Sequence, residues 1–311
     1  MLNTAWWKIK QSPDETAQKC GQLKIALENN QEEKVVALLK EPGLVRSFGI
    51  RRGTDNSYIK ILMNSYKYIM SICKNGRELI LFIHKNKISE YLIWEYMTSA
   101  HRLYDQPIKD QLKQLVIDNE KLFKDNSAKS LMIHELASWS ADLERKYELA
   151  IELNKKAIAL AKKGPDKIVP FRIKFGLSDH KGKRDEKTLR PQERIIDFKK
   201  YSKNFRAYCD EADALRADVE VAAALFDQAK KSPAVDQDKY LLQALSLAKN
   251  IHSQGKKFAY PNVVIIAKEL LGAIASVSNK EEMSKKYYKE AEKLRASYNY
   301  HASNSYRFSQ D

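Results

Sequence analysis

The sequence predicts a nearly all-α protein. Only 10 Gly and 8 Pro interrupt its 311 residues, and residues that favour helices, such as Ala, Leu, Glu and Lys, are abundant. Apolar residues also recur at three- and four-residue spacing along most of the chain, as they do on the buried face of a helix. We therefore predict a helical bundle at residues 1–125, followed by a second helical domain at residues 126–311.

The first elements are predicted to form a helical hairpin. A helix should run from Ser12 to Asn29, because Ser12 is a good N-cap, Pro13 suits the first helical position and two acids follow. Residues 23–45 are similar to one ankyrin repeat, but no second copy follows, so a generic hairpin is the better interpretation. Two glycines and two adjacent arginines predict a loop at residues 49–56.

Residues 58–97 are the most apolar part of the chain, and they predict the packed centre of the N-terminal bundle. The run at 79–83 has the composition of a buried strand as well as of a helix. Because Glu78 and His84 break any strict alternation of apolar and polar residues, we predict a helix. Further helices follow, until polar residues 125–127 indicate a break.

Residues 131–165 predict two antiparallel helices. Small side chains recur on one face of the second helix, where they would let a neighbouring helix approach closely; with the tyrosine that starts the pattern they are Tyr147, Ala150, Asn154, Ala157 and Ala161. The pattern Y-x2-A-x6-A, followed by Gly164-Pro165, resembles the second helix of a tetratricopeptide repeat. The first helix has His134, Ala137 and Ser138 where that repeat has a large apolar residue, Leu and a small residue. A hairpin of an ordinary bundle would show similar spacing.

The same signature recurs near the C-terminus. Leu271-Gly272 precedes a helix with Tyr288 and Ala291, which are spaced as the L-G and the Y-x2-A of the repeat. The resemblance implies a tetratricopeptide-like α-solenoid for residues 126–311. It also implies that Gly272 and Ala291 face each other where the two helices come closest.

Between these two regions the composition changes. Residues 162–206 contain 15 Lys or Arg against six Asp or Glu, together with three Pro and three Gly. We predict a basic connection without helix before about residue 192, in which residues 168–177 form a short strand or an extended segment. A long helix should follow from Pro191 and continue into 222–225. Three more helices are predicted at 238–251, 261–278 and 280–298, and a tail at 299–311.

The charge of the chain indicates an acidic partner. The formal net charge is +15 and the pI is about 9.4, which favours an acidic protein, nucleic acid or an anionic membrane surface. The lysines on the second helix of the central hairpin project away from its small-residue face. We predict partner binding by these lysines and the cations that follow, namely Lys155, Lys156, Lys162, Lys163, Arg172 and Lys174.

Nucleic acid or anionic lipid is the alternative partner for the basic connection. Cations in 162–206 alternate with aromatic residues that could stack on bases, namely Phe171, Phe175, Phe198, Tyr201 and Phe205. No recognised DNA- or RNA-binding motif accompanies them. No stretch of about 18 uncharged apolar residues occurs, so no transmembrane helix is predicted. The N-terminus lacks the features of a secretory signal, and we expect a cytoplasmic protein.

The sequence offers no recognisable catalytic chemistry. The six histidines are dispersed, and the motifs of zinc enzymes, nucleotide-binding loops and serine hydrolases do not occur. Cys20, Cys73 and Cys209 are far apart, which argues against disulfides and a paired metal site. We therefore predict no catalytic residue, cofactor or metal, although an enzyme with an unrecognised site stays an alternative.

The expected function is that of a protein-binding adaptor or regulator, which inhibits or chaperones its partner. A concave surface of helical repeats with a basic character would receive an acidic segment or helix of that partner. A basic, repeat-like protein without a signal sequence is also similar to the regulators that intracellular bacteria use to control their secreted effectors.

Overall fold

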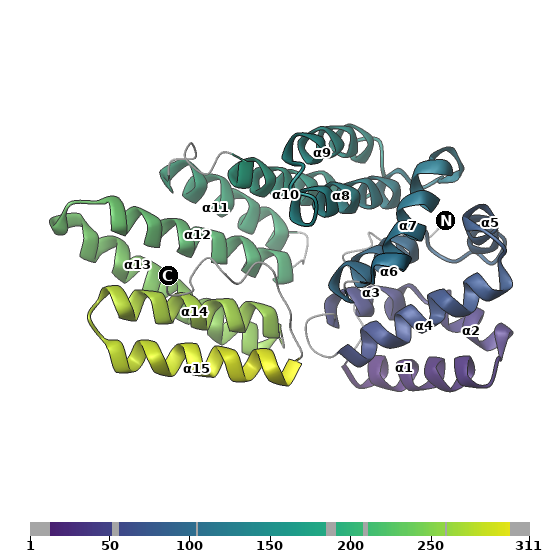
Figure 1. Ribbon diagram of the computed structural model, residues 1–311, viewed down its shortest axis with the longest axis horizontal. Helices are drawn as coiled ribbons and strands as arrows, with labels where there is room; N and C mark the ends of the chain where they lie inside the picture. Colours follow the sequence, from purple (N-terminus) through teal and green to yellow (C-terminus); the bar gives the residue numbers. More distant parts are fainter. Residues whose placement is uncertain are drawn as a thin grey trace. The chain divides into compact units, whose positions relative to one another are not determined.

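The protein is all-α, as the sequence predicted. The computed structural model describes residues 13–51, 56–103, 105–184, 191–207, 211–258 and 260–298, and within these ranges all regular elements are helical (Figure 1). The chain divides into two compact units, residues 1–184 and 185–311. The predicted boundary at residue 125 lies inside the first of these units. The division into folding domains at 1–125 and 126–311 therefore stays a prediction.

The described part of the first unit consists of α-helices and the short 3-10 helix η2 (Glu120–Leu122). Most helices pack on neighbours in the chain: α1 on α2 to α4, α6 on α7 and α8, and α8 on α9 and α10. The helices are α1 (Pro13–Glu28), α2 (Glu32–Leu39), α3 (Pro42–Arg51), α4 (Asn56–Ile72), α5 (Gly76–Lys85), α6 (Tyr91–Leu103), α7 (Gln106–Asp118), α8 (Asn126–Asp142), α9 (Tyr147–Ala161) and α10 (Val169–Arg184).

Capping explains why the apolar run at 79–83 is a helix. The side chain of Asn75 accepts a hydrogen bond from the amide of Glu78 at the start of α5, and the Glu78 carboxylate accepts one from the amide of Lys74. Such reciprocal bonds satisfy amides that have no partner within the helix. Leu79, Ile80 and Ile83 are buried, as one face of an amphipathic helix should be. The prediction of a helix is confirmed.

The hairpin of α8 and α9 has the predicted small-residue contact. Ala137 and Ala141 of α8 pack with Ala150 of α9 in one buried cluster. Further along α9, Asn154, Ala157 and Ala161 are also buried. Small side chains on both helices allow this close packing, and they fix which face of α9 is turned to solvent.

The prediction for residues 162–206 was wrong in its secondary structure. Residues 169–184 form α10, and α11 begins at Pro191. Pro170 lies in the first turn of α10 and Pro191 at the start of α11, where a missing amide costs little, so these two prolines fit helix starts instead of interrupting helices. Gly176 is half-buried against His134, and a Cβ atom there would lie 2.2 Å from its Cε1 atom. The glycine therefore serves a close contact between helices.

The predicted loop at 49–56 also differs from the structure. The helix α3 continues to Arg51 and α4 begins at Asn56, while residues 52–55 lie outside the described ranges. The glycine at position 49 is thus helical. The predicted tail at 299–311 and Cys209 also lie outside the described residues.

The described part of the second unit contains five helices that pack in sequence. Within it α12 also contacts α14, and these two helices are the most buried. The single long helix predicted from Pro191 is two helices that pack on each other, although no Gly or Pro separates them in the sequence. The helices are α11 (Pro191–Ala207), α12 (Glu211–Lys231), α13 (Ala234–Lys257), α14 (Pro261–Val277) and α15 (Glu281–Tyr298).

The contact between α14 and α15 depends on Gly272. The atoms nearest to a Cβ built on Gly272 all belong to the ring of Tyr288, at 3.0–3.1 Å. Ala291, which was predicted to face this glycine, is buried one turn further along α15. The glycine therefore makes room for the tyrosine of the Y-x2-A pattern.

Candidate binding surface

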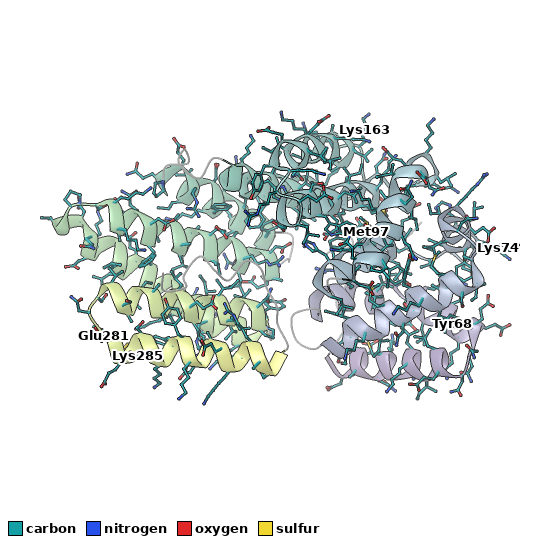
Figure 2. The ribbon with its side chains drawn as sticks, in the orientation of Figure 1. Tyr68, Lys74, Met97, Lys163, Glu281 and Lys285 are labelled. Carbon is teal, nitrogen blue, oxygen red and sulfur yellow. The ribbon has the colours of Figure 1, made fainter. Side chains whose placement is uncertain are left out.

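The inward face of α9 determines which of its lysines reach solvent. Ala150, Asn154 and Ala157 are fully buried, and Lys155 and Lys156 follow Asn154 directly, so the helical period turns both outward. Both are exposed, as are Lys162 and Lys163 at the end of the helix. Figure 2 shows Lys163 at the outer edge of the first unit beside α9.

The helix α10 extends this lysine-rich surface. Its apolar residues Val169 and Ile173 are fully buried, whereas Lys174 and Lys181 are exposed, and so is Lys167 in the preceding turn. We call the seven exposed lysines of this region the α9–α10 lysine surface. They are Lys155, Lys156, Lys162, Lys163, Lys167, Lys174 and Lys181.

The described side chains of this segment include few acids. Among the side chains described between residues 155 and 181, the only carboxylate belongs to Asp166, which is 4% exposed. Its amide donates a hydrogen bond to the hydroxyl of Ser127, and its carboxylate accepts one from the hydroxyl of Tyr91. Asp166 thus binds the turn before α10 to α6 and α8.

Two of the predicted binding residues have contacts within the molecule. The ammonium group of Lys156 lies 2.7 Å from a carboxylate oxygen of Glu120. Lys156, together with Lys129, lowers the pKa of Glu120 below its usual range. The guanidinium of Arg172 lies over the ring of Trp94, 5.2 Å from its centroid. Arg172 is half-buried, so it contributes to packing as well as to charge.

Lys174 also lies close to an aromatic ring. Its ammonium is 5.8 Å from the centroid of Phe171, one turn earlier on α10, but the lysine itself is exposed. The structure therefore places all six predicted residues on α9, α10 or the turn between them. Lys167 and Lys181 were missed, although their charge and their place in the sequence pattern could have identified them.

Three helices meet below the surface at a buried amide. Asn154 of α9 lies between two histidines: its Oδ1 atom is 2.7 Å from Nδ1 of His134, and its Nδ2 atom is 2.8 Å from Nδ1 of His180. The amide nitrogen can only donate and the oxygen can only accept, so one imidazole must donate and the other must accept. Asn154 thereby links α8 to α10. The sequence placed Asn154 on the packed face but did not reveal this bridge.

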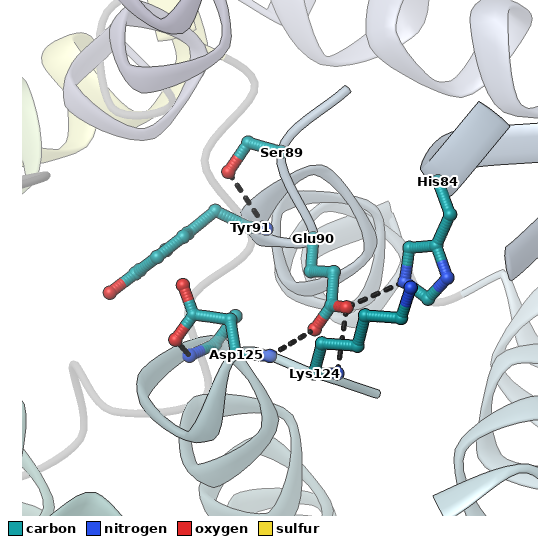
Figure 3. A network of polar contacts seen from close by, with 7 residues as sticks. His84, Ser89, Glu90, Tyr91, Lys124 and Asp125 are labelled. Carbon is teal, nitrogen blue, oxygen red and sulfur yellow. Dashed lines mark hydrogen bonds and ion pairs between the residues drawn. The ribbon is translucent and has the colours of Figure 1, made fainter. Parts of the chain in front are cut away.

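A second buried junction lies at the start of α8. Both oxygens of the Glu90 carboxylate accept hydrogen bonds from backbone amides, those of Lys124 and Asp125, at 2.9 and 3.0 Å. The Nε2 atom of His84 lies 2.7 Å from the same carboxylate (Figure 3). Burial raises the pKa of Asp125, which caps α8, and that of Tyr91 well above its ordinary value. These groups hold helices together, and sequence patterns gave no sign of them.

Glu135 forms a third junction of this kind, between α6 and α8. One of its oxygens lies 2.9 Å from Nδ1 of His101 and also accepts a hydrogen bond from the indole of Trp139 at 2.9 Å. Both the histidine and the carboxylate are thus in contact with neighbouring helices. These contacts link α6 to α8.

The described residues show no arrangement typical of catalysis or metal binding. They contain no group of three or more His, Cys, Asp or Glu that could hold a metal ion. Cys20 and Cys73 are buried and form no disulfide, and burial raises the pKa of the Cys73 thiol, which makes it a poor nucleophile. None of the described helices is long and apolar enough to cross a bilayer.

The aromatic residues proposed to stack on bases are buried or half-buried. Phe198 and Phe205 are buried in the core of the second unit, at 4% and 0% exposure. Phe171, Phe175 and Tyr201 are half-buried. The basic surface and these aromatic side chains therefore do not form one exposed platform.

Fold and surface together define an all-α protein of successively packed helices with a lysine-rich face on α9 and α10. No model of a known protein family matches the chain. No curated protein matches it either.

Proposed function

We propose that this protein is a non-enzymatic adaptor or regulator that binds an acidic segment of another protein on the α9–α10 lysine surface. The observation that carries the proposal is the charge imbalance: seven exposed lysines, and no exposed carboxylate among the side chains described between residues 155 and 181. Opposite charge on a partner raises the rate of encounter and selects against basic partners.

We also propose that the α8–α9 and α14–α15 hairpins are tetratricopeptide-like. The α8–α9 hairpin has small residues at its closest contact, and the α14–α15 hairpin accommodates Tyr288 against Gly272. Proteins built from such hairpins commonly use an extended helical surface to bind other proteins. Control of a secreted effector protein is one role of this kind, and inhibition and chaperoning are two forms that it could take.

Nucleic acid and anionic lipid are the competing ligands for the same cations. Single-stranded nucleic acid is usually bound by cations combined with exposed aromatic rings, and the rings on α10 itself, those of Phe171 and Phe175, are half-buried. This observation favours an acidic protein segment.

The test measures association of three probes with the wild type and a charge-reversal variant. The probes are a polyglutamate peptide, a single-stranded oligonucleotide and vesicles that contain anionic lipid. The variant carries Lys155→Glu and Lys163→Glu; the control carries Lys60→Glu and Lys67→Glu, two exposed lysines of α4. Lys156 is left intact, because a glutamate there would face Glu120.

We expect the first variant to slow association with polyglutamate about tenfold at low salt, and less at high salt because salt screens exposed charges. The control should bind like the wild type. Equal association rates for both variants would contradict the proposed surface. Preference for the oligonucleotide or the vesicles would assign the surface to that ligand instead.

A further inference from the structure

The lysines of the α9–α10 surface recur at one regular interval. Lys155 of α9 and its C-cap residue Lys162 are seven residues apart, and so are Lys174 and Lys181 along α10. Seven residues are nearly two helical turns, so the members of each pair lie on the same side and about 10.5 Å apart along the axis. All four side chains are exposed.

From this spacing we infer that the partner segment is an α-helix with carboxylates at seven-residue intervals on one face, lying along α9 and α10. The inference rests on the proposed function, because it specifies the partner of the same surface. An acidic helix of this kind repeats its charges every 10.5 Å or so on one side, which is the spacing of the lysines.

An extended segment does not match the spacing in the same way. A strand covers about 10 Å in three residues, and residues three apart point to opposite faces. A strand with an acid at every third residue would therefore turn every second carboxylate away from the lysines. Only a helix keeps both the interval and the direction at each step.

The charges along α9 also limit where the acidic face of the partner helix can lie. Glu148 and Glu152 are exposed near the start of this helix, whereas the exposed lysines begin at Lys155. A carboxylate of the partner placed over the first two turns would be repelled. The acidic face should therefore cover the end of α9 and α10, and the partner should be neutral or basic beside Glu148.

Regular spacing matters because exposed ion pairs are weak one at a time. A ligand that forms several such pairs together gains from each additional one only if its geometry lets all of them form at once. Lys156 is already paired with Glu120, so the pairs Lys155–Lys162 and Lys174–Lys181 should dominate.

The experiment compares two synthetic helical peptides of equal length, composition and net charge. In the first, glutamates are spaced seven residues apart on one face; in the second, the same number is spread around the helix. Circular dichroism verifies that both are helical. Fluorescence anisotropy at low salt then measures the affinity of the full-length protein for each peptide.

We expect the peptide with seven-residue spacing to bind about fivefold more tightly, as two additional exposed ion pairs would allow. Lys174→Gln with Lys181→Gln should remove this preference. Lys60→Gln with Lys67→Gln should not, although these lysines of α4 are also exposed and seven residues apart. Thermal melting of each variant checks that it is folded.

Equal affinity for the two peptides would overturn the inferred helix but leave the proposed acidic partner in place. Failure to bind either peptide, while polyglutamate still binds, would also overturn it. Failure of all three acidic peptides would contradict the proposed function itself. Tighter binding of an oligonucleotide, lost in the Lys174→Gln/Lys181→Gln variant, would assign the lysines to phosphate groups.

Discussion

The two units of the molecule join their helices by different means. In the first unit, buried polar side chains link neighbouring helices: Glu90, Glu135 and Asn154 each hydrogen-bond to a neighbouring element. In the second unit, ion pairs join the helices: Arg206 of α11 pairs with the buried Asp218 of α12, and Arg295 of α15 pairs with the buried Glu269 of α14. The same two helices, α14 and α15, also meet closely at Gly272. The carboxylates and the amide of the first arrangement bind amides, imidazoles and an indole, whereas the buried carboxylates of the second bind guanidinium groups.

This difference explains where the surface charge is concentrated. The first unit has 33 Lys and Arg against 22 Asp and Glu, whereas the second has 22 against 18. Several acids of the first unit, among them Glu90, Glu135 and Asp166, are buried at junctions between helices. In the second unit, by contrast, the buried carboxylates of Asp218 and Glu269 are paired with arginines. The basic surface therefore results in part from the way the helices are held together.

We expect the largest effect when a protease separates the two units. Residues 185–190 lie between α10 and α11, and trypsin can cleave after Lys187; the bond after Arg190 precedes Pro191 and resists trypsin. A protease cuts a helix only after it unfolds locally, so we expect the first cuts there and not within α10. Mass spectrometry of the early fragments gives the positions. Early cleavage near residue 125 would favour the boundary predicted from the sequence.

The buried acceptor of the first unit should matter more than a charge at the margin of the second. Glu90→Ala leaves two amides and His84 without their carboxylate, and should lower the free energy of unfolding by about 3 kcal/mol. Glu290→Ala removes a carboxylate that is 38% exposed from a lysine that is 9% exposed, and should cost about 1 kcal/mol.

Urea denaturation followed by fluorescence and circular dichroism measures both effects. All four tryptophans lie within residues 1–184, so fluorescence reports on the first unit alone. A loss for Glu90→Ala no larger than that for Glu290→Ala would mean that the buried junction does not stabilise the first unit.

The stability of the second unit should depend on the volume of the side chain at position 272. Gly272→Leu would push side-chain atoms into the ring of Tyr288 and should destabilise the unit by about 2 kcal/mol. Gly21→Leu is the matched control, because Gly21 lies in α1 with no atom within 4 Å of its built Cβ. That change should be neutral or stabilising, since leucine favours helix over glycine. Unchanged melting of Gly272→Leu would contradict the repeat-like contact.

The smallest expected effect is a pH dependence in the second unit. Burial, and secondarily Lys268 and Lys256, lower the pKa of His252 below its ordinary value of 6.5. The unfolded chain therefore binds a proton more readily than the folded one, and stability should fall as the pH decreases through about 6.5. Denaturation at several pH values should show that the free energy of unfolding falls less in His252→Gln than in the wild type. An identical fall in that variant would exclude His252 as its source.

Some features could be predicted because they depend on neighbours in the chain. The helix at 79–83 follows from its period and from the cap at Asn75, and the small-residue face of α9 follows from spacing alone. The helix within residues 169–184 could not be predicted from composition, because proline and glycine interrupt a helix at some positions and fit into it at others. Pro170 starts a helix, and Gly176 serves a contact with His134 on another helix.

The sequence by itself determined the all-α class, the lysine-rich segment and the side of α9 on which Lys155 and Lys156 lie. These properties follow from the helical period and from local charge. Only the tertiary structure decided that Asp166 is buried, that Glu120 pairs with Lys156 and that Asn154 bridges two histidines. Each of these facts joins residues from different helices, and no local pattern records which distant side chains will satisfy a buried polar group.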